Sequence, residues 1–180
     1  MPDLETVRYP IGHFSYEKPH TTDERLTLLD ALEAYPGQLR RVVTPLTEDQ
    51  LDVPYREHGW TIRQVVHHLA DSHMNGYIRT KLALTEDNPT IKPYEEARWA
   101  DLRDTAAVPV LTSLQLLDAL HARWVALFRS MREADFLGKS FLHPTSQLQT
   151  PLDRQLGMYV WHGKHHLTHI TGLLEREGWQ

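Results

Sequence analysis

The sequence predicts an all-α protein, a four-helix bundle with an extended N-terminal arm and long connections between the helices. Three observations favour this class. Apolar residues recur every three or four positions through long segments, residues typical of helix N-caps precede them, and no segment alternates as a half-buried strand would. The chain has 180 residues, 41% of them hydrophobic, so it can bury one core, and we expect a single domain over residues 1–180.

The first half of the chain is predicted to hold the arm and two long helices. The segments are an extended arm over residues 1–20, a helix over 22–43, a short helical turn at 47–49 and a helix over 61–84. Thr22 is the expected N-cap of the first helix, and Pro36 makes this segment either one bent helix or two short ones. Thr61 and Gln64 form a capping box, which indicates where the second long helix begins.

The second half is predicted to add two more long helices. Its segments are a short helix at 95–102, a helix over 113–131, a loop over 138–149 and a final helix over 150–177. Thr150 and Asp153 resemble a capping box, and Pro151 suits the first helical position. Asp153 is expected on the side of this helix that faces away from its histidines. Four helices of this length with long connections are typical of a bundle.

The composition excludes several classes of function. The formal net charge of −5 offers no basic face to nucleic acid. No stretch approaches the roughly 18 apolar residues of a membrane span, and the first residues lack the basic start of an export signal. We therefore expect a cytoplasmic protein with no nucleic-acid and no membrane partner. Cysteine is absent, so any metal must be held by nitrogen and oxygen.

Histidine is unusually frequent, at 12 of the 180 residues, and most of the histidines fall in two clusters. The clusters are His67, His68 and His73 in one predicted helix, and His162, His165, His166 and His169 in the last. The others, interpreted as incidental, are His13, His20, His58, His121 and His143. His162 and His166 are four residues apart and share a helix face, about 6 Å apart along the axis, where two imidazoles can bind one ion.

A stable metal site needs a third ligand, which a facing helix of the bundle can supply. The first cluster is the obvious source, but His67 and His68 point in different directions on a helix, so at most one of them can face the second cluster. His73 lies in the middle of the apolar stripe. A buried histidine is often a hydrogen-bonded core residue, so spacing alone leaves a metal site and a structural role both open.

Two long motifs identify a family resemblance. They are GWTIRQVVHHLADSHMNGYIRTKLALTEDNPTIKPYEEARWA at residues 59–100 and YVWHGKHHLTHI at residues 159–170, and the segments YPIG at 9–12 and LDVPYREHGW at 51–60 extend them. The sequence resembles the DinB/YfiT-like superfamily, in particular the branch described as metal-dependent hydrolases and, for some members, bacillithiol S-transferases. The resemblance implies a four-helix bundle, often a homodimer, that holds one divalent ion per chain, typically zinc or nickel.

The resemblance also implies which residues bind the ion. By motif position the ligands are His68, the second residue of the HH pair, together with His162 and His166 in the last helix. Many relatives carry glutamine at the position of His169, so the resemblance makes His169 a residue that orients His166 or a substrate rather than a fourth ligand.

Such a site would allow three functions for a small-molecule substrate. A divalent ion held by three neutral imidazoles keeps open positions and can lower the pKa of bound water from about 15.7 to about 7, which would make a hydrolase. It could instead bind a low-molecular-weight thiol similar to bacillithiol and direct its sulfur at an electrophile, which would make an S-transferase. A non-catalytic sensor or carrier is the third alternative.

The sequence does not identify the catalytic residues beside the metal. Asp71 and His73 lie near His68 along the chain, but neither has a spacing that requires it to act as a general base. Arg79 and Arg154 are candidates for holding an anionic substrate, and both are equally well interpreted as solvated surface residues.

Overall fold

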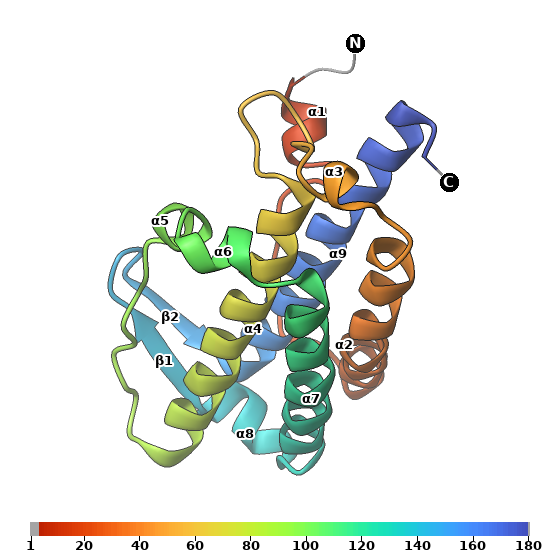
Figure 1. Ribbon diagram of the computed structural model, residues 1–180. Coiled ribbons are helices and arrows are strands. Elements are labelled where there is room, and N and C mark those ends of the chain that lie inside the picture. The colour runs from red at the N-terminus through yellow and green to blue at the C-terminus, as the bar shows by residue number, and fades with distance from the viewer. Residues whose placement is uncertain (1–3, 180) are drawn as a thin grey trace.

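The computed structural model describes residues 4–179 and confirms the all-α class. Four long helices form a bundle, and short helices and one hairpin connect them (Figure 1). The long helices are α2 (Thr22–Val43), α4 (Ile62–Thr85), α7 (Val110–Arg129) and α9 (Leu152–Glu177). The short elements are α1 (Leu4–Arg8), α3 (Glu48–Leu51), α5 (Glu96–Ala100), α6 (Arg103–Ala107), α8 (Glu133–Gly138), β1 (Ser140–His143) and β2 (Leu148–Pro151). No helix in the described part of the chain has the length and apolar character that crossing a membrane requires.

A polar layer crosses the middle of the bundle. Helices α2 and α4 each pack against both α7 and α9, and two clusters of buried apolar side chains fill the space between the helices. The first cluster includes Leu39, Leu69, Leu117 and Ile170, and the second includes Leu32, Trp124, Phe128 and Leu156. His73 on α4, His121 on α7 and His162 on α9 lie along their helices between the residues of the two clusters.

Helix α2 is continuous, so the alternative of two short helices is wrong. Its N-cap is Thr21 and not Thr22, because the capping partner Glu24 lies three residues after Thr21. The Thr21 hydroxyl accepts from the Glu24 N–H at 3.2 Å, and the Glu24 carboxylate accepts from the Thr21 N–H at 2.7 Å. Pro36 lies inside the helix, and because proline has no N–H it cannot donate to the Leu32 carbonyl one turn earlier.

The boundaries of the other long helices follow their local signals. The capping box of Thr61 and Gln64 is confirmed at the start of α4, with bonds of 3.0 and 3.1 Å. The short helix predicted at 95–102 is confirmed as α5, and a further short helix, α6, follows it and was not predicted. Helix α7 begins at Val110, earlier than predicted, because Pro109 occupies its N-cap with the extended backbone that proline favours.

The N-terminal arm is partly helical, which corrects the prediction of an extended arm over residues 1–20. Its first three residues lie outside the described part, α1 follows, and the rest of the arm has mostly irregular structure and contacts α9. Trp161 on α9 donates from Nε1 to the Gly12 carbonyl at 3.2 Å. Gly157 permits the close approach of the arm, because a Cβ atom there would lie 2.8 Å from Cε1 of His20.

Asp153 is fully buried at the junction of the arm, α2 and α9. Its carboxylate accepts hydrogen bonds from the Tyr16 hydroxyl at 2.8 Å, the His20 N–H at 2.9 Å and the Arg25 guanidinium at 3.0 Å. The predicted capping box with Thr150 is wrong, because no side chain caps this end of α9. Burial and the neighbouring carboxylate raise the pKa of Tyr16 to about 12, so its hydroxyl stays a donor.

A two-stranded hairpin, β1 and β2, replaces most of the loop predicted over residues 138–149. The strands pair antiparallel, with Phe141 opposite Thr150. Strands of four residues are too short for a reliable period of two in the sequence. Pro151 closes β2 and serves as the N-cap of α9, so this helix begins at Leu152 and not at Thr150.

Candidate metal centre

The structure brings together the three histidines that the family resemblance selects. His68 on α4 and His162 and His166 on α9 each offer a ring nitrogen, and these nitrogens lie within 4.8 Å of one another. The Nε2 atoms of His68 and His162 are 3.2 Å apart. Two nitrogens bound to one tetrahedral zinc ion at 2.0–2.1 Å would be about 3.3 Å apart, so this pair fits a shared ion.

The surroundings keep these imidazoles neutral. Removal from water lowers the pKa of His68 to about 4 and the pKa of His162 and His166 well below the usual value. The Trp60 ring lies 4.6 Å from the His68 ring and 6.3 Å from the His166 ring, centroid to centroid. Neutral rings present nitrogen lone pairs, which is the form that binds a metal ion.

The helical turn separates the two adjacent histidines of α4. His67 points to α7, where its Nδ1 lies 2.7 Å from the Ser113 hydroxyl. His68 points to α9 and meets His162. Periodicity alone left this pair undecided, and in the structure His68 is the member that faces the second cluster.

A chain of hydrogen bonds that ends at Nδ1 of His162 fixes the orientation of this ring. The Leu32 carbonyl, which Pro36 leaves without its helical donor, lies 2.7 Å from Nδ1 of His121. Nε2 of His121 lies 2.8 Å from Nδ1 of His73, and Nε2 of His73 lies 3.2 Å from Nδ1 of His162. We call this chain, from Leu32 through His121 and His73 to His162, the histidine relay.

The relay sets the tautomer of each member. A carbonyl only accepts, so Nδ1 of His121 must carry its proton and Nε2 of this neutral ring must accept. The same reasoning makes Nδ1 of His73 a donor to His121, and Nδ1 of His162 a donor to His73. The Nε2 lone pair of His162 is therefore directed at His68. Hydrogen bonds of this kind orient metal-ligating histidines and raise their basicity.

Sequence reasoning missed the relay. His121 was interpreted as incidental, yet it is 1% exposed and central to the chain. The spacing of His73 does not require a general base, and in the structure both of its ring nitrogens are engaged by other histidines. The available signal was Pro36 inside an amphipathic helix, because a freed carbonyl in a bundle core requires a donor from a neighbouring helix.

A second contact orients His166. Nε2 of His169 lies 3.0 Å from the Arg8 carbonyl, which makes this nitrogen the donor and leaves Nδ1 of His169 as the acceptor. Nδ1 of His166 approaches that acceptor at 3.4 Å, so its own Nε2 keeps the free lone pair. The Tyr55 ring stacks on His169 at 4.0 Å. This geometry fits the orienting role that the resemblance implied for His169.

A second group, His165, His166 and His169, also has ligand atoms within 4.8 Å of one another. It shares His166 with the first group, so the two groups compete for one ligand. His169 already uses both nitrogens, on Arg8 and on His166. An ion bound to the second group would break a contact of His169, whereas an ion bound to the first group would leave both in place. The first group is therefore the better candidate for a metal ion.

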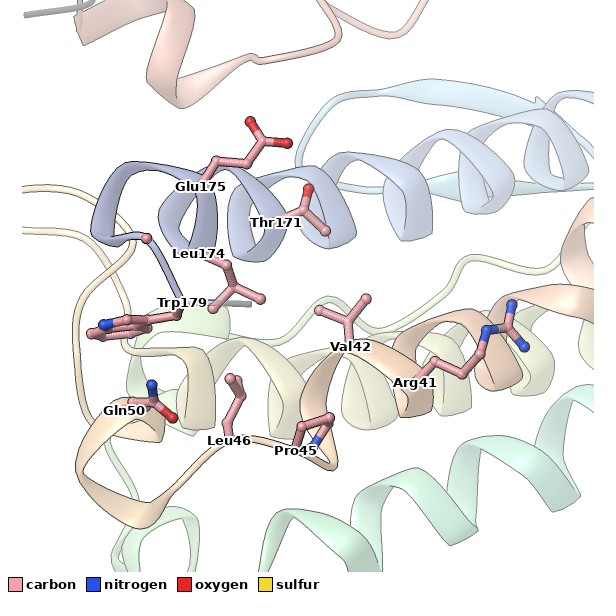
Figure 2. A pocket seen from close by; sticks show the side chains of 10 residues that line it. Arg41, Val42, Pro45, Leu46, Gln50, Thr171, Leu174, Glu175 and Trp179 are labelled. Carbon is pink, nitrogen blue, oxygen red and sulfur yellow. The ribbon is translucent and has the colours of Figure 1, made fainter.

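The other predicted polar residues are distributed around this centre. Asp71 is half-buried, and burial together with the Asp104 carboxylate raises the pKa of Asp71 to about 6. Arg154 lies over the Phe14 ring, at 5.1 Å from its centroid. A cavity of about 390 Å³ lies elsewhere, between the C-terminal ends of α2 and α9, where residues such as Leu46 and Trp179 line it (Figure 2). None of the histidines lines that cavity, so it is separate from the metal centre.

Fold and site together define a class of protein, a helical bundle whose facing helices present a cluster of histidines able to hold a metal ion. Comparison with known families identifies the superfamily within this class. Residues 31–170 match the model of the DinB superfamily, and the chain belongs to this superfamily.

Similar proteins cover nearly the whole chain. Proteins of Bacillus cereus (strain ZK / E33L) and Bacillus anthracis (strain A0248), both named "Putative metal-dependent hydrolase", are 51% and 50% identical to it over 176 residues, which is 98% of this chain and 100% of each relative. The solved structure of YfiT from Bacillus subtilis, described as "a probable metal-dependent hydrolase with an unusual four-helix bundle topology", matches with a TM-score of 0.95 and 45% identity. The match covers 97% of this chain and 99% of YfiT, and it confirms the predicted bundle and the family resemblance.

Proposed function

We propose that this protein is a metal-dependent hydrolase that holds one divalent ion, zinc or nickel, through His68, His162 and His166. The observation that carries the proposal is the meeting of three neutral imidazoles from α4 and α9, two of them with Nε2 atoms 3.2 Å apart. The names of the relatives at 50–51% identity support the same reaction class.

The chemistry follows from the ligand set. A divalent ion with three neutral nitrogen ligands and an open position supplies a water molecule of lowered pKa as the nucleophile. The protein's own residues hold the ligands for this purpose. The histidine relay directs Nε2 of His162, and the contact with His169 directs Nε2 of His166. Both arrangements hold ligand nitrogens in place through contacts within the protein, which limits the reorganisation that binding requires.

The metal site is tested by measuring metal content. We expect about one ion per chain in the purified protein and a large loss in each of His68→Ala, His162→Ala and His166→Ala. His58→Asn is the matched control, because the His58 side chain is 91% exposed and its φ of 55° suits asparagine. Full retention of one ion per chain in all three alanine variants would contradict the proposal.

The reaction is tested by turnover of the metal-loaded protein. A panel of ester and amide substrates should be hydrolysed faster than by the free metal ion, and His162→Ala should lose this activity. A parallel assay supplies a low-molecular-weight thiol with monochlorobimane. Conjugation of the thiol without hydrolysis would show an S-transferase instead, and no rate above free metal in either assay would show a non-catalytic carrier.

A further inference from the structure

A second cavity lies beside the C-terminal part of α4, away from the three histidines of the metal centre. It has a volume of about 350 Å³, within the range of small-molecule sites. Helix α4, the segment that leads into α5 and the turn end of the β1–β2 hairpin line it, and it opens to the surface; Figure 1 shows the hairpin and this segment beside α4. The lining residues are Arg79, Pro93, Tyr94, Glu95, Glu96, His143 and Thr145.

Three of the residues that line this cavity each carry a buried polar atom without a hydrogen-bond partner among the described residues. Nε of Arg79, the hydroxyl of Tyr94 and Nδ1 of His143 are all buried without a hydrogen bond in the described part of the chain. These atoms come from α4, a connecting segment and a strand. Buried polar groups in proteins are rarely left unpaired, so three of them on residues around one cavity point to a polar ligand there.

The unpaired groups suit an anion. Arg79 forms no ion pair with any carboxylate of residues 4–179. A guanidinium binds carboxylate or phosphate oxygens through parallel N–H donors. Burial raises the pKa of Tyr94, so its hydroxyl remains a proton donor beside the guanidinium.

The cavity also limits the charge of the anion. Glu95 and Glu96 are exposed residues that line it, and their carboxylates oppose a second negative charge. A single carboxylate therefore suits this environment better than a doubly charged phosphate.

The cavity is aligned with the metal centre. Arg79 follows His68 by eleven residues, which is three helical turns, so both side chains share one face of α4, roughly 16 Å apart along the axis. The Tyr159 hydroxyl donates to the Ser72 carbonyl at 3.1 Å between these two points. The Tyr159 ring lies 6.0 Å from the His162 ring. The Tyr159 side chain is buried between the two places, so the cavity is a separate site on the same side of α4.

We propose that this cavity is a subsite for a small carboxylate, bound through Arg79 and Tyr94 and separate from the histidine cluster. This carboxylate site goes beyond the proposed function and does not require a metal ion. His143 supplies a third polar contact on the strand side of the cavity.

Binding to the metal-free protein tests the subsite separately from catalysis. The probe is sodium propionate, titrated while the side-chain Nε–H signal of Arg79 is followed by proton–nitrogen NMR, with the signal assigned by its loss in Arg79→Lys. We expect a saturable shift with propionate, a weaker response to methylphosphonate and none to propionamide. Arg79→Gln should weaken propionate binding at least about tenfold, and Tyr94→Phe roughly threefold to tenfold.

Arg154→Lys is the control, because Arg154 lies over Phe14 and outside this cavity. It should leave the dissociation constant of propionate unchanged. Unchanged binding in both Arg79→Gln and Tyr94→Phe, or binding of propionate only to the metal-loaded protein, would overturn the subsite. Loss of metal binding in the histidine variants would leave this result unaffected, so failure of the subsite and failure of the hydrolase proposal are distinguishable.

Discussion

His121 shows how a residue outside the ligand set can control a metal ligand. It joins the Leu32 carbonyl to His73, and through His73 it fixes which nitrogen of His162 faces His68. Nothing in its sequence neighbourhood marks it, because a histidine within an apolar stripe on α7 is compatible with any buried hydrogen bond. Its role becomes visible only when the donor of each bond is assigned in turn.

We expect His121→Asn to weaken metal binding by about 10-fold to 100-fold, as is typical when a residue that orients a ligand is lost. The asparagine amide can still donate to the Leu32 carbonyl, but the nitrogen that accepts from His73 is gone. Competition against a chelating dye measures the affinity, and His58→Asn is the control. An unchanged affinity would show that the relay does not control His162.

Asp71 gives a pH-dependent prediction. Its pKa is raised from 3.8 to about 6 in the folded protein, so the unfolded state loses this proton at lower pH. Stability therefore falls as the pH rises from about 4 to about 6 and stays lower above that range. Asp71→Asn removes this loss. The difference in the free energy of unfolding between the variant and the wild type should therefore be roughly 1 kcal/mol more favourable to the variant at pH 8 than at pH 4, after allowance for solvent screening.

Urea unfolding at pH 4 and pH 8 measures this difference. Asp49→Asn, which removes an exposed carboxylate elsewhere in the chain, is the control variant. If the effect of Asp71→Asn on the free energy of unfolding were the same at both pH values, the raised pKa of Asp71 would be contradicted.

At the scale of elements, α2 supplies the Leu32 carbonyl at which the relay ends. This carbonyl is free because Pro36 has no N–H, and the same proline weakens the helix itself. Pro36→Ala restores an N–H one turn after Leu32, and this N–H would compete with His121 for the carbonyl. We expect the variant to be more stable by about 1 kcal/mol or more, because a proline inside a helix costs about 3 kcal/mol. Its metal affinity should nevertheless fall, roughly threefold to tenfold.

Urea unfolding and dye competition on the same sample measure the two effects of Pro36→Ala. A purely structural role for Pro36 would change stability alone. A rise in stability with no change in metal affinity would therefore contradict the link between α2 and His162.

The elements also show what local sequence determines. The start of α4 follows from Thr61 and Gln64, which need only each other. The hairpin was missed because its strands are held by pairing with each other and by a bond from Ile91 to Leu142, which are contacts between distant segments. Asp153 was misplaced for the same reason, since its partners Tyr16 and Arg25 lie more than 120 residues away.

The candidate site divides in the same way. The spacing of His162 and His166 predicts a shared helix face from local geometry. The choice of His68 over His67 follows from the family resemblance. Neither the spacing nor the resemblance predicts the histidine relay. Hydrogen bonds between helices decide which ring nitrogens are free, and the sequence contains no local pattern for them.

For the whole molecule, a metal site built from residues of two helices predicts that stability depends on the metal ion. An ion that bridges α4 and α9 binds the folded state, so zinc at 100 times its dissociation constant should add about 2.7 kcal/mol to the free energy of unfolding. For a chain of this length the midpoint should rise by about 5–10 °C. Thermal unfolding with zinc and with a chelator measures the rise, which His162→Ala should abolish; an equal rise in that variant would place the ion elsewhere.

The most direct test of the central claim is anomalous diffraction from a crystal of the metal-loaded protein, recorded above and below the absorption edges of zinc and nickel. The proposal predicts one anomalous peak per chain, bonded to Nε2 of His68, His162 and His166. A peak on His165, His166 and His169 instead, or no peak at the bundle centre of a protein shown to contain one ion per chain, would contradict it.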